Sequence, residues 1–190
     1  MTPARKPTAR RSPTTSRVEL REPCRADRAD WCALIRASRR FFAGRAGTAA
    51  TASAFASYLA RAKDPARVYR LIWRKTDGVL LGAINLSEIV RGKFQSCYLG
   101  YYIGPAYTGQ GYMTEALQLM LATAYRRLRL HRVEANIQPN NAASIRLVKR
   151  AGFRREGYSP RYLKIGGRWR DHERWALLAE NWHPAIRFTG

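Results

Sequence analysis

The stretch CYLGYYIGPAYTGQGYMTEAL, residues 97–117, decides the fold of this 190-residue chain. Its first part is a run of apolar and aromatic residues typical of a strand, and Gly104-Pro105 predicts an abrupt strand end because proline cannot extend a ladder. Gly109 and Gly111 come next. Having no β-carbon, they let a loop curl so that several backbone N–H groups point at one spot. The stretch therefore predicts a strand, a loop of bare backbone and a helix.

The helix after the glycines carries apolar residues at steps of three and four positions from Met113 to Leu128, which predicts a core-facing stripe. Four N–H groups at a helix start lack partners, and the helix dipole adds about half a positive charge there. A phosphate or pyrophosphate fits such a place without any side chain. A glycine-bearing turn that only joins strand to helix is the alternative reading of this loop.

Two other phosphate-binding patterns fit the loop poorly. A dinucleotide fingerprint needs Gly or Ala where Thr114 stands, and its acidic residue is missing unless Glu134 serves. A Walker loop needs Gly-Lys-Ser/Thr, which the sequence lacks.

The remaining periodicities predict a mixed α/β fold, with antiparallel strands first and strand-helix-strand units later. The pairs Asp77-Gly78 and Gly166-Gly167 predict tight hairpin turns. Helices are expected from Asp27, over 48–64, from Met113 and over 142–152. Strands are expected at 17–23, 67–74, 78–89, 96–104, 131–137, 153–158, 162–165 and 168–179.

Residues 1–16 carry three prolines and no acidic residue, which predicts a disordered basic arm ahead of a single domain over 17–190. The chain has 35 Lys and Arg against 13 Asp and Glu, a net charge of +22. That balance favours polyanionic partners such as RNA or a ribosome surface. The alternative is an arginine-rich composition that serves solubility alone.

Two further classes of function are disfavoured by composition. Even the longest apolar run is too short for a membrane helix, so we expect no membrane partner. The three cysteines show no metal-binding spacing, so we expect no metal, and their odd number favours a reducing, cytoplasmic location.

Residues 97–117, taken together with IQPNNAASIRLVKRAGFRREG (137–157), resemble the GNAT acyl-CoA N-acetyltransferases. Within that family the likeness is to the branch that acetylates the N-terminal alanine or serine of ribosomal proteins, and it runs from about residue 17 to residue 182. The resemblance implies a GNAT fold: a central, mixed and mostly antiparallel twisted sheet, with splayed fourth and fifth strands, flanked by helices. It also implies acetyl-CoA as cosubstrate.

The family's loop pattern is Gln/Arg-x-x-Gly-x-Gly/Ala, which falls on residues 108–113 with departures at Thr108 and Met113. The resemblance implies that pantetheine pairs with strand backbone around Ile103 and that an N–H there holds the developing oxyanion. The residues expected to bind the cofactor are Tyr102, Ile103, Thr108, Gly109, Gln110, Gly111, Tyr112, Met113, Thr114, Asn141 and Ser144.

The family's Asn-x-x-Ser pair falls on Asn141 and Ser144. Asn141 is also expected to cap the next helix. Ser144 is expected to face the leaving sulfur as a catalytic residue, the alternative being a solvated helix serine. No general base is obvious: Glu134 is the first candidate, with Glu88 and His131 behind it.

The acceptor favoured by the resemblance is the N-terminal α-amine of a ribosomal protein. Residues 39–42 (Arg39, Arg40, Phe41 and Phe42) and 168–175 supply arginines and aromatics that suit RNA or ribosome contact. Two alternatives stay open: transfer to a small-molecule amine, and a non-catalytic RNA-binding module of the same fold.

Overall fold

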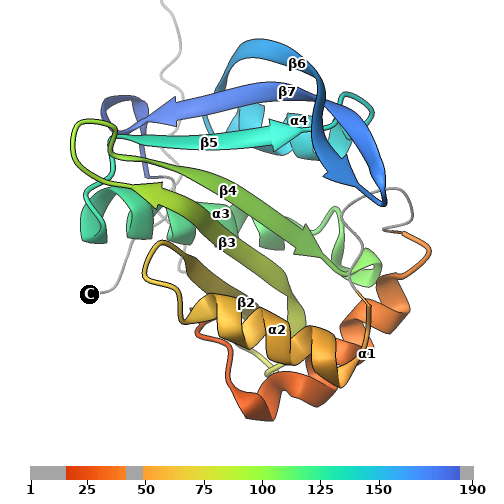
Figure 1. Ribbon diagram of the computed structural model, residues 1–190. Coiled ribbons are helices and arrows are strands. Elements are labelled where there is room, and N and C mark those ends of the chain that lie inside the picture. Colours follow the sequence, from red (N-terminus) through yellow and green to blue (C-terminus); the bar gives the residue numbers. More distant parts are fainter. Residues whose placement is uncertain (1–15, 42–48, 185–190) are drawn as a thin grey trace, which may run out of the picture.

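One mixed sheet of seven strands organises the computed structural model, which describes residues 16–41 and 49–184 (Figure 1). The strand order is β1-β2-β3-β4-β5-β7-β6, and every neighbouring pair is antiparallel except β4 and β5. The predicted mixed and mostly antiparallel sheet is therefore confirmed. The strands are β1 Val18–Arg21, β2 Val68–Arg74, β3 Leu80–Val90, β4 Ser96–Ile103, β5 Arg132–Ile137, β6 Arg154–Ile165 and β7 Arg168–Leu178.

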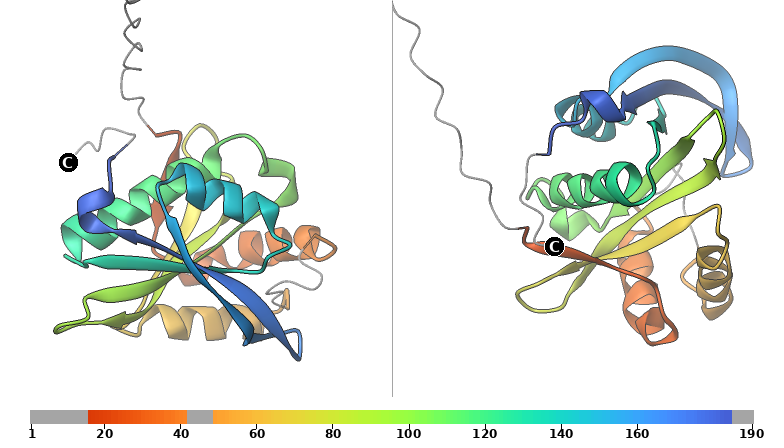
Figure 2. Two further views of the ribbon diagram at one scale, coloured as in Figure 1. Left: turned by 90° about the horizontal axis from the view of Figure 1, so that it is seen from above. Right: turned by 90° about the vertical axis from the view of Figure 1, so that its left-hand side faces the viewer.

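Helices cover both faces of the sheet, as Figure 2 shows. The long helices are α1 Arg28–Ser38, α2 Ala52–Ala62, α3 Tyr112–Ala122 and α4 Ala142–Arg150. The short helical segments are η1 Arg25–Asp27, η2 Pro105–Tyr107, η3 Thr123–Arg127 and η4 Ala179–Asn181. Because α3 and α4 pack on one face and α1 and α2 on the other, each face has its own hydrophobic core.

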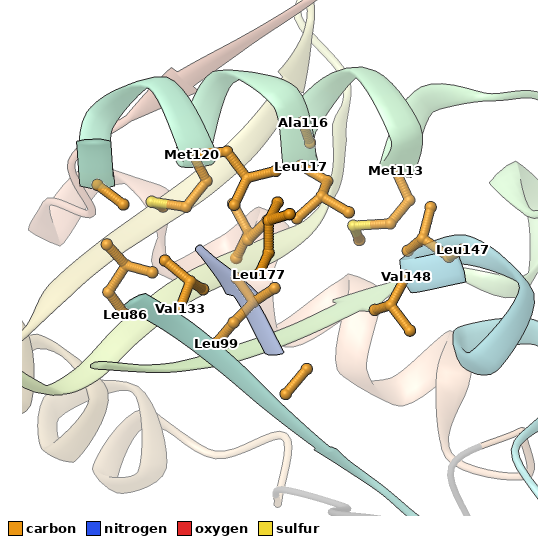
Figure 3. Packing of buried hydrophobic residues seen from close by; sticks show 14 of the residues in the cluster. Leu86, Leu99, Met113, Ala116, Leu117, Met120, Val133, Leu147, Val148 and Leu177 are labelled. Atoms are coloured by element: carbon orange, nitrogen blue, oxygen red, sulfur yellow. The ribbon is translucent and has the colours of Figure 1, made fainter. Parts of the chain in front are cut away.

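Helix α3 packs its apolar stripe against the middle of the sheet (Figure 3). Ala116, Leu117 and Met120 are fully buried, which confirms the side that the periodicity predicts. The predicted helix is α-helical only to Ala122 and continues as the π-helical turn η3.

The opposite face holds an aromatic core. Trp31 of α1 lies 5.3 Å from Phe55 and 5.8 Å from Tyr58 of α2, measured between ring centroids. All three are buried. Offset aromatic pairs at these distances are attractive, so α1 and α2 form one cover over β2 and β3.

Both predicted glycine turns are confirmed. Gly78 between β2 and β3 has φ of 65°, and Gly166 and Gly167 between β6 and β7 have φ of 57° and 78°. These left-handed values suit the hairpin turns that match the twist of the flanking strands.

The predicted division of residues 153–165 into two strands is wrong, because they form the single strand β6. The pairing register of β6 with β7 shifts between Ser159 and Leu163, so Pro160 is accommodated without ending the strand. Arg161 has a φ of 48° within this shift. Asp171 of β7 fixes this bulge: its carboxylate accepts from the Arg161 amide at 2.7 Å and from the Tyr158 hydroxyl at 2.5 Å. Bulges bend strands, and Figure 2 shows the hairpin arching toward the side of α2.

The predicted basic arm falls almost entirely on residues 1–15, outside the described residues. Ser16, its last residue, is buried, and its hydroxyl donates to the Val18 carbonyl at 3.0 Å. Over 16–41 and 49–184, no helix combines the length and apolar character that crossing a membrane requires.

Candidate functional site

Strands β4 and β5 pair only at their beginnings and then separate. Their register joins Ser96 to Arg132, Cys97 to Val133 and Tyr98 to Glu134, and Figure 1 shows the two strands diverging beyond these pairs. The splay that the resemblance implies is therefore present. Among the described residues, no strand pairs with the β5 side of β4 from Leu99 onward, so backbone groups on that side are open.

The alternating direction of backbone groups along β4 decides which of them face the gap between β4 and β5. The Gly104 amide donates to the Leu81 carbonyl of the neighbouring β3 at 2.8 Å, and successive residues of a strand point their amides to opposite sides. The backbone of Tyr102 therefore faces β3, while that of Tyr101 and Ile103 faces the gap. Of the two β4 residues predicted to bind the cofactor, Ile103 alone presents its backbone there.

The glycine loop lies between the end of β4 and the start of α3. Gly109 and Gly111 have φ of 75° and 87°, and Gly111 is the residue that precedes the first turn of α3. Within the described chain, the amides of residues 109–113 donate to no backbone carbonyl. The loop thus presents a cluster of unpaired donors at a helix start, as an anion site requires.

The polar side chains of the loop are turned inward to stabilise it. The Thr108 hydroxyl donates to the Pro105 carbonyl at 2.9 Å, and the Gln110 amide nitrogen donates to the Ala106 carbonyl at 2.9 Å. Tyr112 and Met113 are buried in the core beneath. These residues shape the loop, and only their main-chain amides lie where a phosphate would approach.

Arg17, which no sequence pattern singles out, reaches this loop from the position just before β1. Its amide and its Nε each donate to the Glu115 carboxylate at 2.7 Å, and its Nη2 donates to the Gln110 carbonyl at 2.8 Å. Its guanidinium lies 4.6 Å from the centre of the Tyr112 ring. The contact joins residues more than ninety positions apart, so no local pattern predicts it.

The start of α4 stands across the gap from the open part of β4. The Asn141 side chain accepts from the Ser144 amide at 3.3 Å, which confirms the predicted N-cap. Gly152, with φ of 95°, follows the end of the helix, which is expected over 142–152.

Ser144 shares its surroundings with Tyr101 of β4, another residue that the sequence analysis passed over. Burial raises the pKa of Tyr101 to about 12, and the Ser144 side chain opposes part of that rise. The interaction is not a hydrogen bond of ordinary geometry, because the buried Tyr101 hydroxyl has no such partner. Two hydroxyls from different elements therefore meet at the gap.

The three candidate bases differ in their partners. Glu134 is mostly buried and pairs with Arg132 at 2.7 Å. Glu88 is exposed and pairs with Arg67 at 3.0 Å, and His131 is exposed 3.4 Å from Glu180. Of the three, Glu134 and His131 lie on or beside β5, and Glu134 is the nearer to the point where β4 and β5 separate.

Glu134 belongs to a small charge network. Arg132 also pairs with Glu156 of β6, and this pairing lowers the pKa of the Glu156 carboxyl. The single guanidinium of Arg132 thus pairs with two carboxylates, those of Glu134 and Glu156. Arg132 therefore holds Glu134 in place at the last residue pair of β4 and β5.

No group of three or more His, Cys, Asp or Glu residues that could hold a metal ion occurs in residues 16–41 and 49–184. A surface hollow of about 570 Å³ lies between η1, α2 and β2, lined in part by Pro23, Leu59 and Tyr69. None of the predicted site residues lines it, so it is separate from the gap.

The residues at the gap fit coenzyme A. The amide cluster of the loop suits a diphosphate, the open edge of β4 suits the amides of a pantetheine arm, and the buried Tyr101 hydroxyl and the half-buried Ser144 lie where that edge meets α4. A diverging parallel strand pair beside an amide-lined helix start is also what the resemblance to the acyl-CoA N-acetyltransferases implies. The family model for the acetyltransferase (GNAT) domain matches residues 17–154, and the chain belongs to this family.

Relatives of known or inferred activity lie within the same family. A [ribosomal protein uS5]-alanine N-acetyltransferase of Escherichia coli is 45% identical over 105 residues, covering 55% of this chain and 54% of the relative. A probable N-acetyltransferase of Bacillus subtilis, YjcK, is 40% identical over 107 residues, covering 56% and 59%. The chain thus spans little more than half the length of these curated relatives.

A solved structure resembles the fold over most of its length. Mycobacterium smegmatis RimJ in complex with CoA-disulfide superposes with a TM-score of 0.77 at 28% identity, covering 86% of this chain and 82% of that one. That share of the chain is larger than the part that the family model matches.

Proposed function

We propose that this acetyltransferase transfers an acetyl group from acetyl-CoA to the N-terminal α-amine of a ribosomal protein that begins with alanine or serine. The similarity to the uS5-alanine enzyme, 45% over 105 residues, supports this acceptor. The observation that carries the proposal is the pairing of an amide-lined loop with an unpaired strand edge. Acetyl-CoA supplies the activated acyl group as a thioester.

The cofactor-binding role falls to main-chain groups in this proposal. The amides of residues 109–113 hold the diphosphate, aided by the positive end of α3. Arg17 adds a guanidinium beside the same loop. On β4, the backbone of Ile103 faces the gap and orients the acyl carbonyl, and its N–H stabilises the negative charge that develops on the acyl oxygen.

Glu134 is proposed to accept the proton of the acceptor amine, directly or through water. An α-amine titrates near about 8, so a useful fraction is already neutral at cellular pH and a weak base is enough. The Glu134 carboxylate, which pairs with Arg132, is proposed to act as this weak base. Glu134→Gln should then lower turnover, and a variant with unchanged kcat at every pH would remove Glu134 from this role.

Ser144 is proposed to donate a hydrogen bond to the leaving sulfur from the first turn of α4. Asn141 fixes that turn by capping it, so the serine hydroxyl is held at the end of the gap. Asn141 therefore serves the site through the helix start, and Ser144 through its own hydroxyl.

The arched β6–β7 hairpin is proposed to contact ribosomal RNA. Trp169 is 59% exposed near its turn, and four basic residues accompany it: Lys164, Arg168, Arg170 and Arg174. The carboxylate of the nearby Asp171 accepts hydrogen bonds from the Tyr158 hydroxyl and the Arg161 amide. Exposed aromatic rings stack on bases and arginines bind phosphates. Such a partner implies a cytoplasmic location. Of the residues 39–42 also predicted for this contact, Phe41 is exposed and Phe42 lies outside the described residues.

Mass spectrometry of ribosomal proteins before and after deletion of the gene tests the acceptor. One ribosomal protein is expected to lose an N-terminal acetyl group, and purified enzyme should restore it on a peptide of the same first residues. Peptides beginning with alanine or serine should be acetylated faster than polyamines or aminoglycosides. Faster transfer to a small amine would overturn the ribosomal acceptor while leaving the acetyltransferase assignment intact.

A further inference from the structure

Tyr101 carries a buried hydroxyl that the fold does not satisfy. It lies on β4 beyond the last residue paired with β5, and its hydroxyl oxygen is inaccessible to solvent and has no hydrogen-bond partner of ordinary geometry within residues 16–41 and 49–184. Its ring packs against the core beneath α3 and α4. Leaving a buried polar group unpaired costs free energy, so such a group calls for an explanation.

Other buried tyrosines of this chain show the contrast. The Tyr125 hydroxyl donates to the Leu177 carbonyl at 2.8 Å, and the Tyr58 hydroxyl donates to the Asn85 side chain at 3.3 Å. Those two phenols stabilise the packing between elements. The Tyr101 phenol has no comparable structural task, and it is the one that lies at the separation of β4 and β5.

Ser144 is the side chain that interacts with the Tyr101 hydroxyl. The Ser144 side chain lowers the pKa of the phenol against the rise that burial causes, as a hydroxyl that points its hydrogen at the phenol oxygen does, yet the pair makes no well-formed hydrogen bond. They come from elements on opposite sides of the gap, β4 and α4. Catalytic hydrogen bonds are often long in a resting enzyme and tighten only when substrate binds.

We infer that Tyr101 is a positioning residue for acyl transfer: when the Ser144 hydroxyl turns its hydrogen from the phenol to the leaving sulfur, the Tyr101 hydroxyl donates to Ser144 Oγ and holds the serine in that orientation. The inference rests on the proposed function, in which Ser144 faces that sulfur. A serine hydroxyl can accept and donate at once. A donor behind it fixes which direction its own hydrogen takes.

Tyr101 acts in this scheme as a hydrogen-bond donor and not as an acid. Its pKa is about 12, whereas an ordinary thiol titrates near about 8.5, so proton transfer from the phenol to a thiolate is unfavourable. A phenol with so high a pKa stays protonated throughout the neutral range and is always able to donate. As the N–C bond forms and the C–S bond breaks, the nitrogen loses one proton and the sulfur gains one, so none is taken from Tyr101.

A double-mutant cycle tests whether Tyr101 works through Ser144. Tyr101→Phe, Ser144→Ala and the double variant are compared in steady-state acetylation of an alanine-starting peptide, with acetyl-CoA affinity measured by calorimetry. Loss of one net hydrogen bond predicts a fall in kcat of about five- to tenfold for Tyr101→Phe, with the dissociation constant unchanged. The double variant should be no slower than Ser144→Ala alone. Effects that multiply would overturn the inference.

The stability of the protein without acetyl-CoA gives a second readout. Tyr101→Phe removes an unsatisfied hydroxyl, so its unfolding midpoint should equal or exceed that of the parent. Tyr125→Phe is the matched control, because it removes a satisfied buried hydroxyl and should lower the midpoint while leaving kcat unchanged. If Tyr101→Phe is destabilised as much as Tyr125→Phe, the Tyr101 hydroxyl is an ordinary structural group and the inference fails.

The outcomes separate this inference from the proposed function. Full activity of Ser144→Ala would refute both the sulfur-facing serine and its positioning by Tyr101. A slow Ser144→Ala beside a fully active Tyr101→Phe would refute the inference alone. If no peptide is acetylated, the proposed acceptor fails by itself, and the two unfolding midpoints still decide whether the Tyr101 hydroxyl is unsatisfied.

Discussion

Substitution of Gly111 by valine tests the amide-lined loop directly. Gly111 has φ of 87°, and holding a residue with a side chain in that region costs about 1–3 kcal/mol. For a chain of this size, 1 kcal/mol corresponds to about 2–4 °C in Tm. A loss of about 2 kcal/mol thus predicts a fall of about 4–8 °C. A β-carbon at this position would also meet Arg17 Nη2 at 3.2 Å, so the guanidinium must move.

The effect of Gly111→Val on acetyl-CoA binding should be larger than its effect on folding. Displacing two charge-assisted hydrogen bonds costs about 3 kcal/mol or more, which is about a hundredfold in the dissociation constant. Gly167→Val is the matched control, because Gly167 has a similar φ of 78° and open space around its β-carbon position. Both variants should lose comparable stability, but only Gly111→Val should lose affinity in calorimetry. Equal acetyl-CoA affinity of the two variants would refute the anion cradle.

Three further predictions concern other residues. Ser144→Ala should lower kcat while leaving acetyl-CoA affinity nearly intact in calorimetry, and a collapse of affinity would make Ser144 a binding residue. Arg17→Gln should raise the dissociation constant of acetyl-CoA several-fold at low salt and less at high salt, since screening weakens an exposed guanidinium; salt-independent loss would contradict that role. The Tyr158 and Arg161 hydrogen bonds lower the pKa of Asp171, so its stabilisation is present above the unfolded pKa of about 3.9 and is lost as pH falls through the folded pKa. Unfolding midpoints of the parent should therefore fall between pH 5 and pH 3 more than those of Asp171→Asn, and parallel curves would contradict this.

Local sequence patterns determined most of the elements. The apolar period placed α3 and its buried face, the Asp77-Gly78 and Gly166-Gly167 pairs placed two hairpins, and Asn141 and Gly152 marked the ends of α4. Each of these signals depends on neighbours within a few positions, where period, capping and turn chemistry act. The glycine loop could be located in the same way, because its conformation is set by its own residues.

Only the tertiary structure decided which groups meet at the site. Tyr101 meets Ser144 because β4 leaves β5 after three residue pairs, and Arg17 reaches Gln110 because β1 runs beside the start of α3. The continuity of β6 likewise depends on Asp171 of the facing strand, ten residues from Arg161. Contacts across such separations arise from strand pairing and packing, for which a single sequence carries no periodic signal. The conformation of the glycine loop therefore depends on its own residues, whereas the partners of each hydroxyl and charged group depend on the fold.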